Sequence, residues 1–137
     1  MYYIKSELIE VRESIGKGKG VFAKRNIKPG TIVECSPVLV LSAKDTKALE
    51  STFLYNYYFI WGDKGRKTAI ALGYCSLYNH DYHSNCIYET DYEDLTFKVI
   101  TRFPIKKGEE LFINYNFYPD DESKVWFDKS KTVKKKK

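Results

Sequence analysis

The chain has 137 residues, of which 43% are hydrophobic and 30% charged, and its formal net charge at pH 7 is +5. This size and composition predict one globular domain with a hydrophobic core of its own. Four of the positive charges belong to the terminal run Lys134–Lys137. The rest of the chain is nearly neutral, which argues against strong direct nucleic-acid binding. No run of eighteen apolar residues occurs, so we expect no membrane-spanning segment.

The first half of the chain has the pattern of short strands joined by turns. Residues 1–13 alternate loosely between apolar and polar side chains and predict one or two strands. Glycines at positions 16, 18 and 20 allow positive φ angles and a close approach of the backbone to another group. The further expected elements are a buried strand at 21–23, a Pro-Gly turn at 26–30, strands at 31–35 and 38–41 interrupted at Pro37, and a helical segment at 42–50.

The second half continues this pattern around an unusual central segment. The aromatic-rich run 52–61 fits either a strand or a loop. The remaining expected elements are a turn at 62–66, an apolar segment at 68–73, a turn at 91–94, a half-buried strand at 95–100, a turn at 105–110 and a strand at 111–115. Many short strands with little helix predict a mainly β fold.

The central segment, residues 74–88, contains both histidines of the chain, His80 and His83, among tyrosine, asparagine and cysteine. These side chains donate, accept or titrate, so the segment is the first candidate for a functional site. Cys35, Cys75 and Cys86 do not have the spacing of zinc ligands. We therefore expect reduced, mostly buried thiols and no metal site.

Four motifs, in order along the chain, resemble those of one family, the SET-domain protein lysine methyltransferases. The motifs are Lys17–Ala23, the turn Ile27–Gly30, Asn79-His80 followed by Asn85, and Gly108–Tyr115. One such motif is weak evidence, whereas an ordered set is specific. The resemblance extends over roughly residues 8–118.

The resemblance implies a SET-domain fold of short sheets with a C-terminal pseudoknot, in which the last motif threads past the Asn79-His80 segment. We expect the SET domain at 1–128, and the lysine-rich end of the chain predicts a basic, disordered tail at 129–137. The tail has a second interpretation, as a tether to an acidic partner. The chain departs from the family pattern at Asp81, where serine is usual, and at Ser84, where proline is usual. It also lacks the cysteine-rich flanks of larger members.

The resemblance further implies S-adenosylmethionine as cofactor. The backbone of Lys17, Gly18, Lys19 and Gly20 would reach its methionine end. Asn79 would bind its amino group through the side-chain carbonyl. His80 would bind the adenine edge through the backbone, and an aromatic after the last motif, Trp126, would stack on the adenine. The alternatives are an ordinary glycine-rich turn, a structural histidine and C-terminal core packing by Trp126.

The catalytic residues implied by the family are tyrosines. Tyr115 would align the methyl group with the target amine, and it would also touch the cofactor. Its ordinary pKa near 10 makes it a poor base at neutral pH. Tyr88 and, more weakly, Tyr57 would line the lysine channel. With twelve tyrosines in the chain, packing at the rim or in the core is the competing interpretation for each.

The expected partner is a protein substrate with a target lysine, such as a histone or another basic protein, and a homodimer fits the small relatives. Residues 1–7 turn polar early and lack a signal-peptide core, so the expected location is cytoplasmic, or nuclear in a eukaryote. The carboxylate of Asp81 near the cofactor region keeps an alternative function open. This alternative is an inactive SET scaffold that serves as a protein-binding module.

Overall fold

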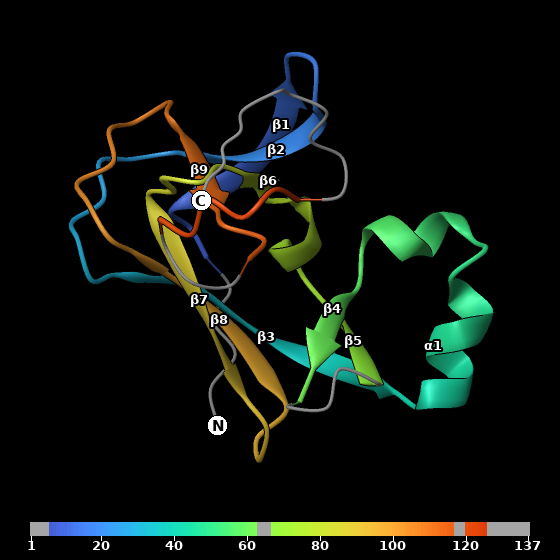
Figure 1. Ribbon diagram of the computed structural model, residues 1–137. Helices are drawn as coiled ribbons and strands as arrows, with labels where there is room; N and C mark the ends of the chain where they lie inside the picture. The colour runs from blue at the N-terminus through green and yellow to red at the C-terminus, as the bar shows by residue number, and fades with distance from the viewer. Residues whose placement is uncertain (1–5, 63–66, 117–119, 126–137) are drawn as a thin grey trace.

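The computed structural model describes residues 6–62, 67–116 and 120–125, and strands dominate it (Figure 1). One sheet has the strand order β1-β2-β9-β6 and the other has the order β4-β5-β3-β8-β7. The strands are β1 (Ile9–Ser14), β2 (Gly18–Ala23), β3 (Ile32–Leu41), β4 (Phe59–Trp61), β5 (Lys67–Ala71), β6 (Asn79–His80), β7 (Cys86–Asp91), β8 (Thr96–Thr101) and β9 (Glu110–Ile113). The mainly β prediction is confirmed. Within the described ranges, no helix is long and apolar enough to cross a membrane.

The glycine motif closes the hairpin between β1 and β2. Gly16 and Gly18 have φ angles of 77° and 78°, which favour glycine because it has no Cβ. The amide of Lys17 donates to the carbonyl of Ser14 at 2.9 Å across the turn. The φ angle of Gly20 is not positive. Glycine is therefore required at this position because of the neighbouring side chains and not because of the backbone conformation.

The predicted break at Pro37 is wrong, because β3 runs through it without interruption. Residues 32–37 of β3 pair with β8, and residues 38–41 pair with β5 on the other side. Pro37 lies where the pairing of β3 changes from β8 to β5. Because proline has no backbone N–H, this position is one where few hydrogen bonds between strands are lost. The proline therefore marks a change of partner and not the end of a strand.

The helical prediction is confirmed by α1 (Ala43–Leu49), and the aromatic run divides into a 3-10 helix, η1 (Phe53–Asn56), and β4. Ser42 caps α1 by accepting a hydrogen bond from the Asp45 amide at 3.1 Å. The hydroxyls of Thr46 and Thr68 lie 2.8 Å apart and join α1 to β5. Figure 1 shows α1 and η1 forming an arm to one side of β4 and β5.

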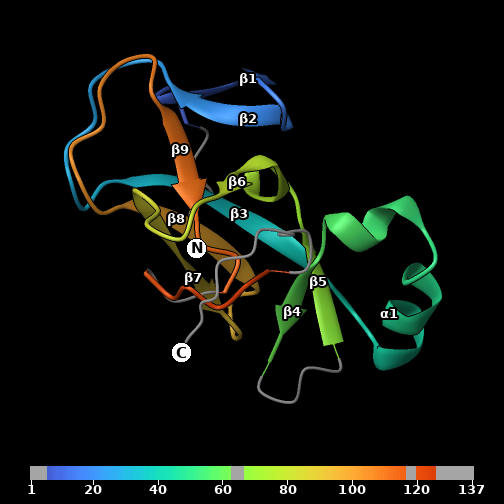
Figure 2. The ribbon, with the colours of Figure 1, turned by 45° about the horizontal axis from the view of Figure 1, so that its top comes forward.

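The two similar turns of the sequence lie side by side. Ile27 and Ile105 exchange both backbone hydrogen bonds, at 2.7 and 2.9 Å. This pairing brings the last motif back to the centre, where β9 runs parallel to β6 (Figure 2). In register, Asn79 lies beside Phe112 and His80 beside Ile113. The threading of the last motif past the Asn79-His80 segment is thus confirmed.

Candidate active site

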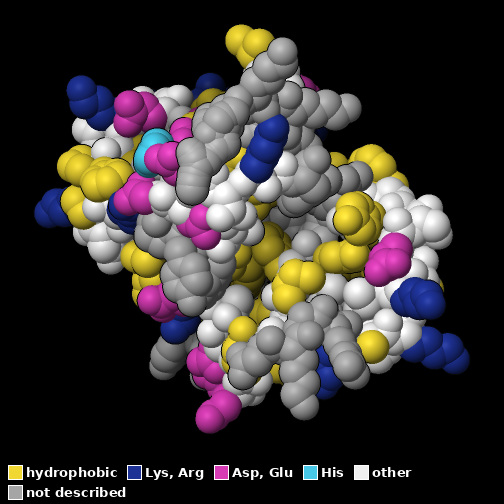
Figure 3. Space-filling view, in the orientation of Figure 1, with side chains coloured by type: hydrophobic (Ala, Val, Ile, Leu, Met, Phe, Trp, Pro, Cys, Tyr) yellow, Lys and Arg dark blue, Asp and Glu magenta, His cyan; other side chains and the backbone are white. Residues whose placement is uncertain are grey.

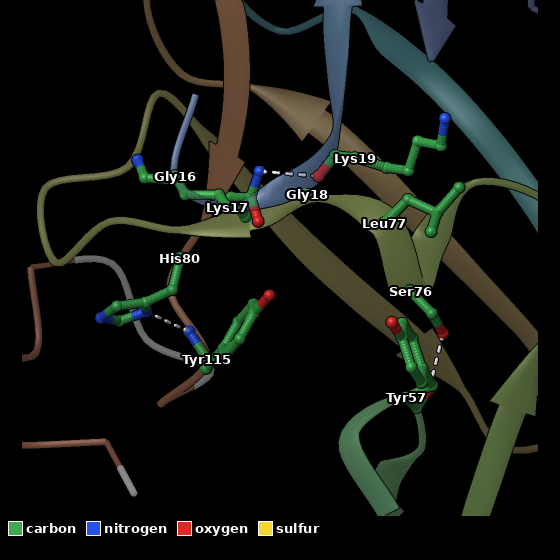
Figure 4. Close-up of a pocket in the computed structure, with 10 residues that line it drawn as sticks. Gly16, Lys17, Gly18, Lys19, Tyr57, Ser76, Leu77, His80 and Tyr115 are labelled. Carbon is green, nitrogen blue, oxygen red and sulfur yellow. Dashed lines mark hydrogen bonds between the residues drawn. The ribbon is translucent and has the colours of Figure 1, made fainter. Parts of the chain in front are cut away.

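A pocket of about 390 Å³ lies between the β1–β2 turn, Tyr57 and the segment from a second 3-10 helix, η2 (Cys75–Leu77), to β6 (Figure 4). The residues that line it are Gly16, Lys17, Gly18, Lys19, Tyr57, Ser76, Leu77, Asn79, His80 and Tyr115. The threading therefore gathers three sequence motifs and the aromatic run around one cavity.

Asn79 has a side chain whose orientation is fixed by two acceptors. Its Nδ2 donates to the Lys19 carbonyl at 3.0 Å and to Oε2 of Glu110 at 2.7 Å. Both neighbours are acceptors, so the nitrogen and not the oxygen of the amide faces them. The Oδ1 atom then remains as the acceptor that Asn79 presents at the pocket.

Gly20 lies next to the pocket and is not among the residues that line it. A Cβ at this position would lie 2.5 Å from Oε2 of Glu110 and 2.9 Å from Nδ2 of Asn79. Glycine is therefore required because the Asn79–Glu110 pair packs against the backbone of β2.

His80 braces Tyr115 through its ring. Its Nδ1 accepts a hydrogen bond from the Tyr115 amide at 3.0 Å, so the proton of the neutral ring is on Nε2. β6 is an edge strand, and the amide of Asp81 donates to the carbonyl of Ile113. In a parallel ladder of this register, the N–H and C=O of His80 point away from β9. The backbone of His80 thus faces the edge of the sheet, as a backbone contact to an adenine would require.

Tyr115 turns its hydroxyl to the carbonyl of Tyr78 and donates to it at 2.7 Å. Burial raises the pKa of Tyr115 to about 12, and Tyr57 and Glu110 add to the increase. The phenol is therefore neutral at physiological pH and cannot serve as a base. Its oxygen retains lone pairs that can accept weak contacts from groups in the pocket.

Tyr57 lies across the cavity from Tyr115 (Figure 4). The hydroxyl of Ser76 donates to the Tyr57 carbonyl at 2.6 Å and ties the end of η1 to η2. The ring of Phe53 packs against the ring of Tyr57, with centroids 5.2 Å apart. The weaker of the two predicted channel residues is thus one that the structure places on the pocket.

A buried carboxylate supports the segment from Tyr74 to Tyr78. Glu34 is only 4% exposed and accepts a hydrogen bond from the Tyr78 hydroxyl at 2.9 Å. It also accepts from the backbone amide of Tyr74 at 2.7 Å and from the thiol of Cys75 at 3.2 Å. The Ser36 hydroxyl donates to it at 2.6 Å. These donors compensate for the desolvation of the carboxylate and fix the wall of the pocket.

Comparison with known proteins identifies the fold. The sequence matches the SET domain family over residues 18–116, which is most of the chain and contains the motifs described above except for Lys17 at the start of the first. The chain belongs to the SET-domain family. It is 34% identical over 121 residues to the Schizosaccharomyces pombe histone-lysine N-methyltransferase specific for H3 lysine-37, a match that covers 88% of this chain and 77% of the relative.

Solved structures agree with this assignment of the SET domain. A candidate histone methyltransferase of Plasmodium falciparum superposes with a TM-score of 0.63 at 25% identity, over 82% of this chain and 95% of that one. A chain of the Chaetomium thermophilum Polycomb Repressive Complex 2, bound to S-adenosylmethionine, superposes with a TM-score of 0.68 at 21% identity. That match covers 83% of this chain and 16% of the other, and it shows the fold alone. The protein is a SET-domain lysine methyltransferase.

Tyr88, which the family resemblance predicts on the lysine channel, is buried in this SET domain. It is 8% exposed and its ring stacks on Phe97, with centroids 4.7 Å apart and planes at 13°. Phe59 packs beside it at 5.8 Å. Residues two apart on a strand face the same side, and Cys86, two residues earlier, is also buried. Tyr88 thus packs in the core and is not among the residues that line the pocket. The predicted stacking residue Trp126 lies outside the described residues.

Asn85 braces the crossing of the SET domain through its side-chain amide. Its Nδ2 donates to the Glu110 carbonyl at 2.9 Å, and its Oδ1 accepts from the Phe112 amide at 2.8 Å. The two hydrogen bonds satisfy the backbone carbonyl of Glu110 and the backbone amide of Phe112, both in β9. An asparagine is needed because it offers a donor and an acceptor on one short side chain.

Asp81, the departure from the family pattern, is exposed and does not line the pocket. Its Oδ1 accepts a hydrogen bond from the His83 amide at 2.9 Å and closes a tight turn after β6. The expected carboxylate near the cofactor therefore has a local structural role instead.

A charged cluster ties this turn to the segment after β9. Nδ1 of His83 lies 3.1 Å from a carboxylate oxygen of Asp120, and Nε2 lies 3.2 Å from one of Glu122. Arg102 also pairs with Asp120, at 2.9 Å. Figure 3 shows acidic side chains gathered around a histidine on this face. The contact with Asp120 raises the pKa of His83 above its ordinary value of 6.5.

Gly16, Ser76 and Leu77 line the pocket and were missed from the sequence. Gly16 directly precedes the motif Lys17–Ala23, so its position in the sequence could have indicated that it lies at the pocket. Ser76 and Leu77 lie in the central segment, but no motif distinguishes them from their neighbours.

Proposed function

We propose that this SET domain transfers a methyl group from S-adenosylmethionine to the ε-amino group of a lysine in a histone or another basic protein. The single observation that carries the proposal is a pocket lined by both Tyr115 and Asn79, whose Nδ2 is held by two acceptors. The SET domain family uses S-adenosylmethionine. The histone substrate is supported by the name of the yeast relative.

The residues of the pocket fit this cofactor. Asn79 offers a carbonyl oxygen to an ammonium group, and Lys17 and Lys19 carry positive charge suited to a carboxylate. The cavity of about 390 Å³ is within the range of small-molecule sites.

The cofactor supplies an activated methyl on a sulfonium. The cofactor would supply this methyl to the nitrogen of a lysine amine that has first released its proton to solvent, and its sulfur would leave as a neutral thioether. The protein must therefore hold a neutral amine in line with the methyl group. The half-buried rings of Tyr57 and Tyr115, which line the pocket, would exclude water from part of the amine and lower its pKa. Tyr115 acts by alignment, because its own raised pKa keeps it protonated.

Replacement of Tyr115 tests this assignment. We expect Tyr115→Phe to lower transfer of a labelled methyl to histone by about 100-fold or more, the usual loss when one oriented polar group is removed from an active site. The variant loses one hydrogen bond, to the Tyr78 carbonyl, and should stay folded. Tyr92→Phe is the control, because Tyr92 is 52% exposed and packs on Trp61 away from the pocket. Full activity of Tyr115→Phe would contradict the assignment.

Calorimetry with S-adenosylmethionine separates an enzyme from a binding scaffold. The proposal predicts saturable binding at one site per chain. A failure to bind, at concentrations far above those of ordinary cofactor dissociation constants, would favour the inactive scaffold. The position of Asp81 outside the pocket gives no support to that alternative.

A further inference from the structure

We propose that Glu110 is a positioning residue for the cofactor, which acts through Asn79 to select a ligand with an ammonium group. This inference rests on the proposed function, since it assigns the part of the cofactor that the site recognises. Glu110 does not line the pocket. It begins β9 and reaches the pocket through its hydrogen bond with Asn79.

The carboxylate of Glu110 joins three elements. Its Oε1 accepts from the hydroxyl of Ser14 at the end of β1, at 2.8 Å. Its Oε2 accepts from Nδ2 of Asn79 on β6, at 2.7 Å. Gly20 on β2 leaves the space for this arrangement, because a Cβ there would lie 2.5 Å from the same Oε2 atom. Side chains from distant parts of the sequence thus hold one carboxylate in one place.

This arrangement decides which end of the Asn79 amide faces the ligand. A carboxylate only accepts hydrogen bonds, so it holds the Nδ2 end of the amide and directs Oδ1 elsewhere. The short charge-assisted bond also polarises the amide and makes Oδ1 a better acceptor. An acceptor of this kind fits an ammonium group.

The charged residues around the pocket support the same inference. Lys17 and Lys19 are the charged residues among those that line it, and both are positive. Lys19 pairs with Glu13 at 2.9 Å, and the ammonium of Lys17 lies over the ring of Phe112. S-adenosylmethionine carries a sulfonium and an ammonium as well as its carboxylate, so two lysines alone would repel it. Glu110 supplies a negative charge directly behind Asn79 that offsets this repulsion.

The test compares two ligands that differ in the amino-acid end, which carries the ammonium group. S-adenosylhomocysteine keeps the amino-acid end of the cofactor, whereas 5′-methylthioadenosine lacks it. We expect calorimetry to show that Glu110→Ala weakens the binding of S-adenosylhomocysteine by about tenfold or more. The affinity for 5′-methylthioadenosine should change less than twofold. A purely structural role would weaken both ligands together.

Further variants separate orientation from charge and guard against misfolding. Glu110→Gln can keep both hydrogen bonds and loses only the charge, so its loss of affinity for S-adenosylhomocysteine should be smaller than that of Glu110→Ala. Gly20→Ala should show the same ligand selectivity, because its Cβ displaces the carboxylate without removing it. Glu109→Gln is the matched control, since its carboxylate accepts from the Lys106 amide in the exposed turn.

The outcomes distinguish the inference from the function on which it rests. If the unmodified protein binds neither ligand, the proposed function fails. If the unmodified protein binds S-adenosylhomocysteine and folded Glu110 variants bind it equally well, or lose both ligands in parallel, the role of Glu110 is overturned. Circular dichroism of each variant establishes that it is folded.

Discussion

The brace formed by Asn85 gives the sharpest prediction about stability. Asn85→Ala removes the donor to the Glu110 carbonyl at 2.9 Å and the acceptor for the Phe112 amide at 2.8 Å. Each lost bond is worth about 1 kcal/mol net, and partly buried backbone groups left without a partner cost more. We therefore expect the free energy of unfolding to fall by about 2–4 kcal/mol, a large share of the ~5–15 kcal/mol typical of a domain.

Urea unfolding followed by circular dichroism measures this loss. Asn85→Asp keeps an acceptor for Phe112 but sets an oxygen against the Glu110 carbonyl, so we expect it to be destabilised as well. Asn26→Ala is the control, because Asn26 makes one exposed hydrogen bond, to the Lys107 amide at 2.9 Å, and should cost under about 1 kcal/mol. Equal unfolding free energies for Asn85→Ala and Asn26→Ala would refute the reasoning.

Two further predictions concern a buried and an exposed charge. Tyr78→Phe removes a donor from buried Glu34 and should lower the free energy of unfolding by about 1.5–3 kcal/mol, whereas Tyr74→Phe should change it little, because Tyr74 donates through its backbone. The pKa of His83 is raised by Asp120, so its contribution to stability is complete below pH 6.5 and is lost as the pH rises through the raised pKa. An NMR titration should show that Asp120→Asn returns the His83 pKa toward 6.5, and an unchanged value would contradict the contact.

Local chemistry determined many of the elements. The glycines at 16 and 18 specify the hairpin turn because only that residue takes positive φ without cost. Ser42 caps α1 as a short hydroxyl side chain does at a helix start. The order of the motifs was enough to identify the family and to expect Asn79, His80 and Tyr115 at one site. Each of these signals lies within a few neighbouring residues, which is the range over which a sequence pattern is informative.

Only the tertiary structure decided which side chains face the pocket. Tyr88 and Tyr57 have the same chemistry, but the register of β7 against β8 turns Tyr88 onto Phe97. The hydrogen bond between Glu110 and Asn79 depends on the pairing of β9 with β2 and β6, so the sequence alone did not predict it. These contacts join residues far apart in the chain, and no local pattern encodes them. The physical reason is that strand pairing, and with it the direction of every second side chain, is settled by non-local packing.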